Sequence, residues 1–447
     1  MPVALGLDFG TTSISAAAVA EDGRLVDRVT RPHRADVAGL PPGHAEQSPD
    51  LLLRTALDAL AELAARLTEP PTCLGLTGQM HGVLPTDADG RPLTNLVTWQ
   101  DKRSLEPTGH GGTWLDRFRS FCDPAAVSRT GCAPSPGYLA VTLFTLLNLN
   151  RNGVPPSVRY ALLLADWAAA TLTGTEPVTD RTNAASTGVY DLERDEWSEL
   201  IDATGLPREF FPKVVESGTI VGGLTSEFAA HTGLPEGLPV ASAIGDHQAA
   251  VLGSLPAGED AVQVNIGTGG QVSLPVPWFL RTPTSDTRYL PDGRFLLVGA
   301  GMAGGDAYAW VRRAVAGWLA AFGIERSDDE LFAALNRLAA AAPPGCDGLR
   351  CEPFFRGTRR EPDRRGVFVG IATENFTPGH VARAVLEGIA EALAAFVRDH
   401  SRLPEVSGAF TRVIATGNAV RRNRLLAVSL ARAFGLPVFV PEHEEEA

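Results

Sequence analysis

Two segments of the chain share one pattern, and this repetition restricts the fold more than any other feature. Residues 5–19 read LGLDFGTTSISAAAV, and residues 262–276 read VQVNIGTGGQVSLPV. In each, an apolar strand ends at a bend rich in Gly and Thr, and a second strand follows, which predicts a β-hairpin. The same hairpin at two places predicts two similar α/β halves, each built on a mixed sheet.

The apolar spacing elsewhere completes both halves. It predicts a type I′ turn at Asp22-Gly23 and a short buried strand at 73–80. We expect a boundary after residue 238, which gives domains 1–238 and 239–447. Helices are expected at 51–67, 138–153, 160–174, 307–322, 329–342 and 380–400, and from 418 to 434. The final EHEEEA resembles the start of a helix covering the strand before it, so we expect the chain to stop short of its natural end.

Composition limits the partners. The formal net charge of −13 argues against nucleic acid, which needs a basic face. The chain lacks the roughly 18 consecutive apolar residues of a membrane span and begins without a basic leader, so we expect a cytoplasmic protein that binds no membrane. Lys102 and Lys213 are the only lysines, and no GKS or GKT occurs, which excludes a P-loop.

The two Gly/Thr bends are suited to hold one polyphosphate between the halves. Backbone N–H groups and hydroxyls bind phosphate oxygens, and glycine lets the backbone approach closely. Asp8, at the end of the first strand, is then placed to serve Mg²⁺, which prefers one or two carboxylates together with phosphate oxygens. The alternative is that Thr and Ser only satisfy a tight turn.

Seven motifs in order resemble the FGGY family of carbohydrate kinases over essentially the whole chain. They are DFGTTS at 8–13, GQMHG at 78–82, WQDKR at 99–103, GDHQA at 245–249, NIGTGG at 265–270, RGVFVGI at 365–371 and EGIAEAL at 387–393. The resemblance implies duplicated ribonuclease H-like domains, as in actin and Hsp70, flanking a catalytic cleft. LVTWQD at 96–101 and NAASTGVYDL at 183–192 are most similar to sedoheptulokinases, with xylulokinases next.

The resemblance implies ATP and Mg²⁺ as cofactors and assigns roles along the chain. Asp246 is the proposed catalytic base and a second metal ligand beside Asp8. The alternative for Asp246 is a helix N-cap, and His247 is expected only to line the site. For the nucleotide, the matching positions are Thr11, Thr12, Ser13, Gly267, Thr268, Gly269, Gly305, Gly417 and Asn418. Asn418 stands where many members have glycine, and Ala309 where some have glutamine.

A third group of residues is expected at the sugar. Asp and Arg at alternating positions offer a hydroxyl an acceptor and a donor, and Trp gives an apolar wall. A surface ion pair is the alternative for Asp101 and Arg103. The expected sugar residues are Gln79, Met80, His81, Trp99, Asp101, Arg103, Asn183 and Asp246.

We therefore expect an ATP-dependent ketose kinase that closes its domains over the substrate. Phosphorylation of sedoheptulose to its 7-phosphate is the first expectation, and xylulose or another sugar of the family is the alternative. A chaperone or filament protein of the same fold has no need of GQMHG and WQDKR. The intact Asp8 and Asp246 argue against a non-catalytic regulatory protein. The sequence does not show the oligomeric state, and a homodimer is compatible with it.

Overall fold

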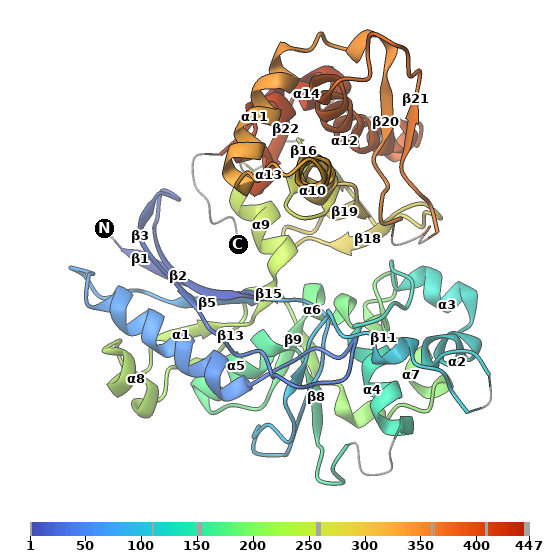
Figure 1. Ribbon diagram of the computed structural model, residues 1–447. Coiled ribbons are helices and arrows are strands. Elements are labelled where there is room, and N and C mark those ends of the chain that lie inside the picture. The colour runs from blue at the N-terminus through green and yellow to red at the C-terminus, as the bar shows by residue number, and fades with distance from the viewer. Residues whose placement is uncertain are drawn as a thin grey trace.

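The computed structural model describes residues 2–109, 111–149, 154–255, 261–358, 361, 363–406 and 410–441. Figure 1 shows two α/β parts one above the other, the first half of the chain below and the second half above. Each part is built on one mixed sheet. The last six residues, where we expected a helix to begin, lie outside the described residues.

The first sheet begins with the predicted hairpin. Along β1 buried and partly buried residues alternate, because one face packs on a core that contains Leu7, Leu52 and Trp167. In spatial order its strands are β13 (Ile220–Gly223), β14 (Pro239–Ala241), β5 (Leu74–Gly78), β1 (Val3–Phe9), β2 (Ser13–Ala20) and β3 (Leu25–Pro32), and β15 (Ile244–Gly245) also pairs with β5.

The second sheet repeats this arrangement. Its order is β18 (Asp286–Tyr289), β19 (Phe295–Met302), β17 (Gly270–Val276), β16 (Val262–Ile266), β22 (Val413–Thr416) and β23 (Val438–Phe439). β1 is antiparallel to β2 and parallel to β5, as β16 is antiparallel to β17 and parallel to β22. The predicted duplication is confirmed.

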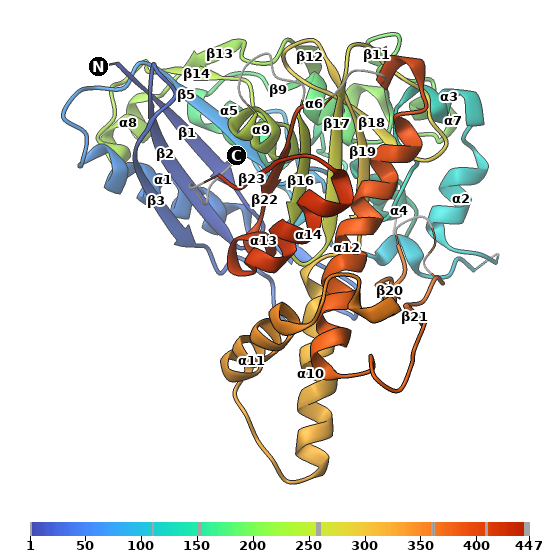
Figure 2. The same ribbon diagram turned by 90° about the horizontal axis from the view of Figure 1, so that it is seen from above.

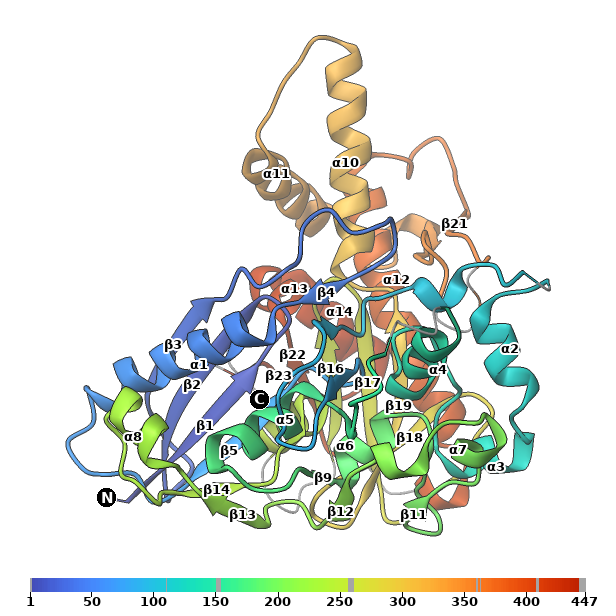
Figure 3. The same ribbon diagram turned by 90° about the horizontal axis from the view of Figure 1, so that it is seen from below.

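Helices cover the sheets, and capping residues mark where they begin. Ser48 caps α1 by accepting the Leu51 N–H, and Pro49 occupies the first turn. The helices of the first part are α1 (Pro49–Ala64), α2 (Trp114–Ser120), α3 (Pro124–Arg129), α4 (Leu139–Leu149), α5 (Leu164–Thr173), α6 (Arg181–Ser186), α7 (Leu200–Ala203) and α8 (Ser226–Thr232). Those that follow are α9 (Asp246–Ser254), α10 (Gly305–Ala321), α11 (Asp328–Ala341), α12 (Pro378–His400), α13 (Asn418–Arg422) and α14 (Arg424–Phe434). α10 projects far beyond the sheets (Figures 2 and 3).

Short strands outside the two sheets complete the architecture. They are β4 (Glu46–Gln47), β6 (Leu84–Thr86), β7 (Leu96–Val97), β8 (Tyr160–Leu162), β9 (Val178–Asp180), β10 (Tyr190–Asp191), β11 (Glu196–Trp197), β12 (Lys213–Val215), β20 (Arg350–Glu352) and β21 (Val367–Val369). No helix in the described ranges is long and apolar enough to cross a membrane.

Three local expectations need correction. β14 and β15 pair with β5, so the first sheet continues past residue 238, where we expected the boundary. Residues 160–162, expected in a helix, form β8 because they pair with β6. Of Asp22 and Gly23 only Gly23 has a positive φ, of 81°, whereas a type I′ turn needs both.

Candidate active site

The register of the first sheet brings two of the predicted acidic residues together. β1 and β15 both pair in parallel with β5, so that Asp8 and Ile244 each lie opposite Thr77. Asp8 lies one residue before the end of β1, and Asp246 follows β15 directly. Both carboxylates therefore lie at the same edge of the sheet, where the parallel strands end.

Burial raises the pKa of both carboxyl groups at this edge of the sheet. Burial, and after it the charge of Asp246, raises the pKa of Asp8 to about 7. Burial likewise raises the pKa of Asp246 to about 6, although the His247 N–H and the Arg288 guanidinium act in the lowering direction. The Oδ1 atom of Asp8 is buried and has no hydrogen-bond partner within the described part of the chain. The pair therefore favours a proton or a cation beside it.

Asp246 is the first residue of α9, and Gly245 occupies the N-cap position. Oδ1 of Asp246 accepts the N–H of the next residue, His247, at 2.7 Å. A capping carboxylate would instead accept the N–H of a residue two or three positions further along. The N-cap alternative is therefore wrong. His247 Nε2 lies 2.9 Å from the Ser273 hydroxyl, and burial lowers the pKa of the imidazole to about 3. His247 is therefore neutral at pH 7.

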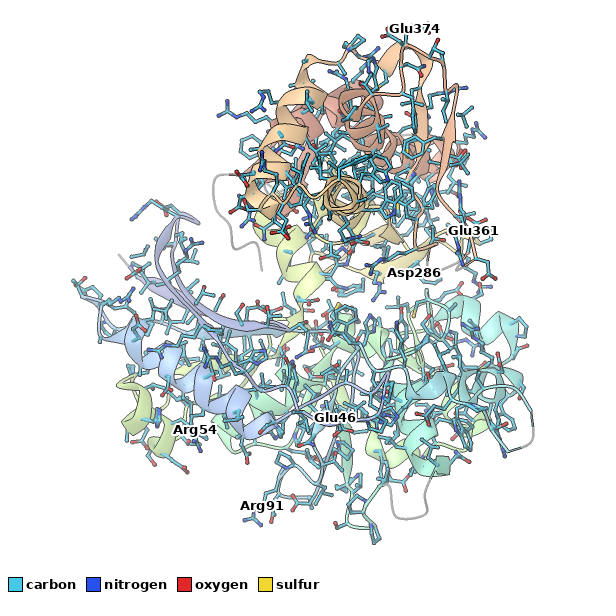
Figure 4. The ribbon with its side chains drawn as sticks, in the orientation of Figure 1. Glu46, Arg54, Arg91, Asp286, Glu361 and Glu374 are labelled. Atoms are coloured by element: carbon cyan, nitrogen blue, oxygen red, sulfur yellow. The ribbon has the colours of Figure 1, made fainter. Side chains whose placement is uncertain are left out.

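Arg288 brings a positive charge from the second sheet toward this edge. It lies on β18, is buried, and donates from Nη2 to the Tyr138 hydroxyl at 3.3 Å and to Asp286 at 3.4 Å. Figure 4 shows Asp286 on the side of the second part that faces the first. The backbone joins the two parts as well, because the Thr287 N–H donates to the Gly131 carbonyl at 2.7 Å.

The first predicted phosphate loop is held from several sides. The Thr11 carbonyl accepts from Gln47 Nε2 at 2.9 Å and from His33 Nε2 at 2.8 Å. Its hydroxyl accepts from Trp99 Nε1 at 3.0 Å. Thr12 is exposed and Ser13 is partly exposed. The bend thus has a fixed backbone, with Thr12 open to solvent.

The second predicted phosphate loop, residues 267–269, lies among glycines at the starts of two helices, α10 and α13. The Gly305 N–H donates to the Gly267 carbonyl at 2.9 Å. A Cβ at Gly305 would lie 2.6 Å from that carbonyl oxygen, and one at Gly304 would lie 2.2 Å from the carbonyl carbon of Gly269. Gly417 has a φ of 90°, and a Cβ there would lie 2.6 Å from the Ile266 carbonyl oxygen. Only glycine allows these approaches.

Thr268 and Gly269 are exposed at the tip of this loop, and Asn418 is exposed at the first position of α13. Gly417, Asn418 and Gly305 therefore gather around the bend, as predicted for one nucleotide site. Ala309, one turn into α10, is partly exposed.

The predicted sugar loop follows β5 directly. Gln79 donates from Nε2 to Gln47 at 2.9 Å, while its own Oε1 is buried with no partner among described atoms. Met80 is buried. His81 has a φ of 63°, donates from Nδ1 to the Ser186 carbonyl at 2.6 Å, and stacks on Tyr138 with 4.0 Å between ring centroids.

The second predicted sugar segment contains a buried ion pair next to an exposed ring. Trp99 is 42% exposed. Arg103 donates to both carboxylate oxygens of Asp101 at 2.9 Å and to Glu46 at 2.7 Å. The side chains of Asp101 and Arg103 are 1% and 7% exposed, so a surface ion pair is the wrong description. Glu46 is labelled in the first part in Figure 4.

Asn183 lies on α6 and is buried away from solvent. Its Nδ2 donates to Asp166 at 3.0 Å and to the Ala243 carbonyl at 3.3 Å. Sequence reasoning missed four residues that contact the predicted site: Gln47, Tyr138, Thr182 and Arg288. Thr182 adjoins the NAASTGVYDL motif and Tyr138 follows Gly137, but Gln47 and Arg288 stand in no glycine-flanked motif that would single them out.

No cluster of three His, Cys, Asp or Glu side chains suited to a metal occurs among the residues described. Two carboxylates between two phosphate-type bends nevertheless fit Mg²⁺, which takes its other ligands from water and phosphate. The unpartnered Asp8 oxygen is the specific feature that fits such an ion.

Comparison with known proteins decides the family. A model of the N-terminal domain of the FGGY family of carbohydrate kinases matches residues 3–253, and a model of its C-terminal domain matches residues 264–447. The chain belongs to this family. It is an ATP-dependent carbohydrate kinase, and the alternative of a chaperone or filament protein is excluded.

Relatives with different substrates align over most of the kinase. Sedoheptulokinase from Mus musculus is 28% identical, with 98% of this chain and 94% of the relative covered. Xylulose kinase from Lactococcus lactis is 26% identical, with 94% and 81% covered. The crystal structure of xylulose kinase from Rhodospirillum rubrum superposes with a TM-score of 0.86 at 26% identity, covering 98% of this chain and 86% of that one. The expected two-domain fold of actin and Hsp70 type is confirmed.

Proposed function

We propose that this kinase transfers the γ-phosphoryl group of ATP to the terminal hydroxyl of sedoheptulose, giving sedoheptulose 7-phosphate. The observation that carries the chemistry is the carboxylate pair Asp8 and Asp246 at the sheet edge where β1 turns into the first phosphate bend. The similarity to sedoheptulokinases over almost the whole chain supports the choice of sugar. The motifs LVTWQD and NAASTGVYDL point the same way.

Asp246 is the general base in this proposal. Its carboxylate takes the proton of the attacking hydroxyl while that oxygen bonds to the γ-phosphorus and ADP leaves. A pKa of about 6 suits this role, because the group is mostly ionised at pH 7 and is still a better base than an ordinary aspartate. His247 does not compete for the proton, since its pKa of about 3 makes it a weak base.

The two bends and the glycines around them bind the nucleotide. Their backbone N–H groups and hydroxyls neutralise phosphate charge, and the absence of Cβ atoms lets phosphate and adenosine approach. The proposed nucleotide residues are Thr11, Thr12, Ser13, Gly267, Thr268, Gly269, Gly305, Gly417 and Asn418.

Asp8 and Asp246 would hold the Mg²⁺ ion. These residues would place a positive charge beside the phosphates, where it would neutralise the negative charge that develops during transfer. Asp8 would contribute its unpartnered oxygen Oδ1, and burial, followed by the charge of Asp246, raises the pKa of this carboxyl to about 7.

The sugar lies against the loops after β5 and β7. Trp99 offers an exposed wall, and the buried Oε1 of Gln79 offers an acceptor that lacks a described partner. His81 is oriented by Ser186 and Tyr138. The proposed sugar residues are Gln79, Met80, His81, Trp99, Asp101, Arg103 and Asp246. Asn183 lines the same end of the site, with its amide hydrogens bound to protein oxygens.

The experiment that tests the substrate is a panel of sugars at equal enzyme and ATP concentrations, followed by release of ADP. The panel is sedoheptulose, xylulose, ribulose, gluconate and glycerol, and the expected result is the highest kcat/KM for sedoheptulose. Turnover of xylulose tenfold better would make the choice of sugar wrong and leave the kinase activity intact. Xylulose is the second candidate, because a xylulose kinase superposes over nearly the whole chain. A homodimer and a cytoplasmic location stay predictions.

A further inference from the structure

The short helix α6 contacts both the residue before the proposed base and the sugar loop. At its start, the Gly245 N–H donates to the Thr182 hydroxyl at 2.8 Å, and that hydroxyl donates to Asp180 Oδ1 at 2.7 Å. Asn183, the next residue, donates to the Ala243 carbonyl at 3.3 Å. The segment that leads into Asp246 is therefore attached to α6 at two points.

The other end of α6 holds the sugar loop. Ser186, the last residue of the helix, accepts from His81 Nδ1 at 2.6 Å through its carbonyl. Its hydroxyl lies 3.4 Å from the backbone nitrogen of His81 and donates to the Asn183 carbonyl at 2.8 Å. The imidazole of His81 is therefore oriented from α6.

A direct contact closes the ring. A Cβ at Gly245 would lie 2.8 Å from both Sδ and Cε of Met80, so Met80 packs on the residue that precedes Asp246. Gly245 contacts Met80, whose neighbour His81 is bound to the end of α6, and the start of α6 is bound to Gly245 again. Each member of this ring thus contacts the next one.

Burial makes these bonds costly to lose. Thr182 and Asp180 are 0% exposed, and Asn183 and Asp166 are 1% exposed. Asp180 also accepts the hydroxyl of Ser217 and the Asn183 N–H, the latter at 2.9 Å. A buried donor left without its acceptor destabilises the fold by its full desolvation free energy, because water does not replace the lost partner.

We propose that α6 is a positioning element that sets the distance between Asp246 and the sugar loop, with Thr182 and Asn183 as its positioning residues. This inference rests on the proposed function, since it takes Asp246 as the base and residues 79–81 as sugar contacts. Asn183 acts through Ala243 rather than as the main sugar ligand, because both hydrogens of its amide are directed at buried protein oxygens.

The first test is Thr182→Val, which keeps the shape and removes the hydroxyl. We expect kcat to fall by about tenfold to a hundredfold, because small displacements of a catalytic group cost that much. KM values for ATP and sugar should stay within about threefold, since the ground-state contacts remain. Thr182→Ser restores the hydroxyl and should recover most of kcat. Thr145→Val is the matched control: its hydroxyl is buried in α4, bonds a helix carbonyl at 2.8 Å, and lies outside the site.

The second test is Asn183→Ala, which separates the two roles of this residue. A positioning role predicts lower kcat with nearly unchanged sugar KM, whereas a sugar ligand predicts a large rise in sugar KM. This variant also serves if Thr182→Val does not fold. Wild-type kcat in Thr182→Val or in Asn183→Ala overturns the inference, as does a loss in Thr182→Val that Thr182→Ser does not recover. Failure of the proposed function has a different signature, namely an Asp246→Asn enzyme that keeps its rate.

Discussion

Asp8→Asn is expected to stabilise the metal-free enzyme at pH 8, although it removes a carboxylate that we propose as a ligand of Mg²⁺. The carboxylate of Asp8 has a pKa of about 7 in the folded chain, because burial and the charge of Asp246 oppose its ionisation. An unfolded Asp ionises near 3.9. Because the pKa is higher in the folded state, the protonated carboxyl of Asp8 stabilises the fold fully below about pH 4. This stabilisation is lost as the pH rises through about 7. An amide has no charge to bury and avoids this loss.

The size of the effect follows from the same values. Each pKa unit is worth about 1.4 kcal/mol, so the ionised carboxylate costs folding up to about 4 kcal/mol at pH 8. Asp8 is partly exposed, and screening by water reduces the expected gain to about 1–3 kcal/mol. At pH 5 Asp8 is protonated in the folded state, so the gain should shrink by more than half.

The assay is thermal melting in EDTA at pH 5 and pH 8. Asp116→Asn is a control of opposite sign, because hydrogen bonds from Thr113 lower the pKa of that capping-box carboxyl. Asp116→Asn should therefore lower the Tm at pH 8. Equal melting of Asp8→Asn and wild type at pH 8, or a gain that grows toward pH 5, would refute the argument. Mg²⁺ should raise the Tm of the wild type and not that of Asp8→Asn.

Three further substitutions test other parts of the site. Gly305→Ala puts a methyl group 2.6 Å from the Gly267 carbonyl oxygen, so KM for ATP should rise about tenfold with the sugar KM unchanged. The control is Gly317→Ala, where the added methyl group would meet no described atom within 4 Å apart from its own helix backbone and chain neighbours. Equal KM values for ATP in the two variants would contradict the role of the bend. Arg103→Leu leaves the carboxylates of Asp101 and Glu46 without their guanidinium. The free energy of unfolding, measured with denaturant, should fall by about 3–5 kcal/mol. A loss below about 1 kcal/mol would show that the ion pair is dispensable. Asp246→Asn should lower kcat by about 10²–10⁴-fold in single-turnover phosphorylation. Retention of a tenth of the rate would remove Asp246 from the base role.

The hairpins, the main helices and the duplication could be predicted because each depends on local pattern. Alternation of buried and partly buried residues along β1 is visible in its sequence, as is the helical spacing of α12. The boundary was misplaced because β14 and β15 read as the start of a new unit, although they pair with β5. Pairing between strands so distant in the chain leaves no local signal.

Predictions for individual site residues were limited in the same way. Asp8 and Asp246 were named from their places at strand ends, and the structure brings them together. The buried partners of Asn183 could not be predicted, because Asp166 and Ala243 lie on other elements. The ion pair of Asp101 and Arg103 was foreseen as an alternative, but its burial depends on how the segment of Glu46 folds over it.

The sequence motifs suggest a phosphate loop and a separate sugar loop, but hydrogen bonds connect the two. Trp99 Nε1 donates to the Thr11 hydroxyl at 3.0 Å, and Gln79 reaches the Thr11 carbonyl through Gln47, with 2.9 Å in each step. Two residues proposed for the sugar therefore hold a residue proposed for the phosphates. If the sugar packs on the indole, it also restricts the donor that orients Thr11, so ordering of one site lowers the entropic cost of ordering the other. Kinetic effects of changing Trp99 then belong to both substrates, and a rise in KM for ATP alone does not argue against its contact with the sugar.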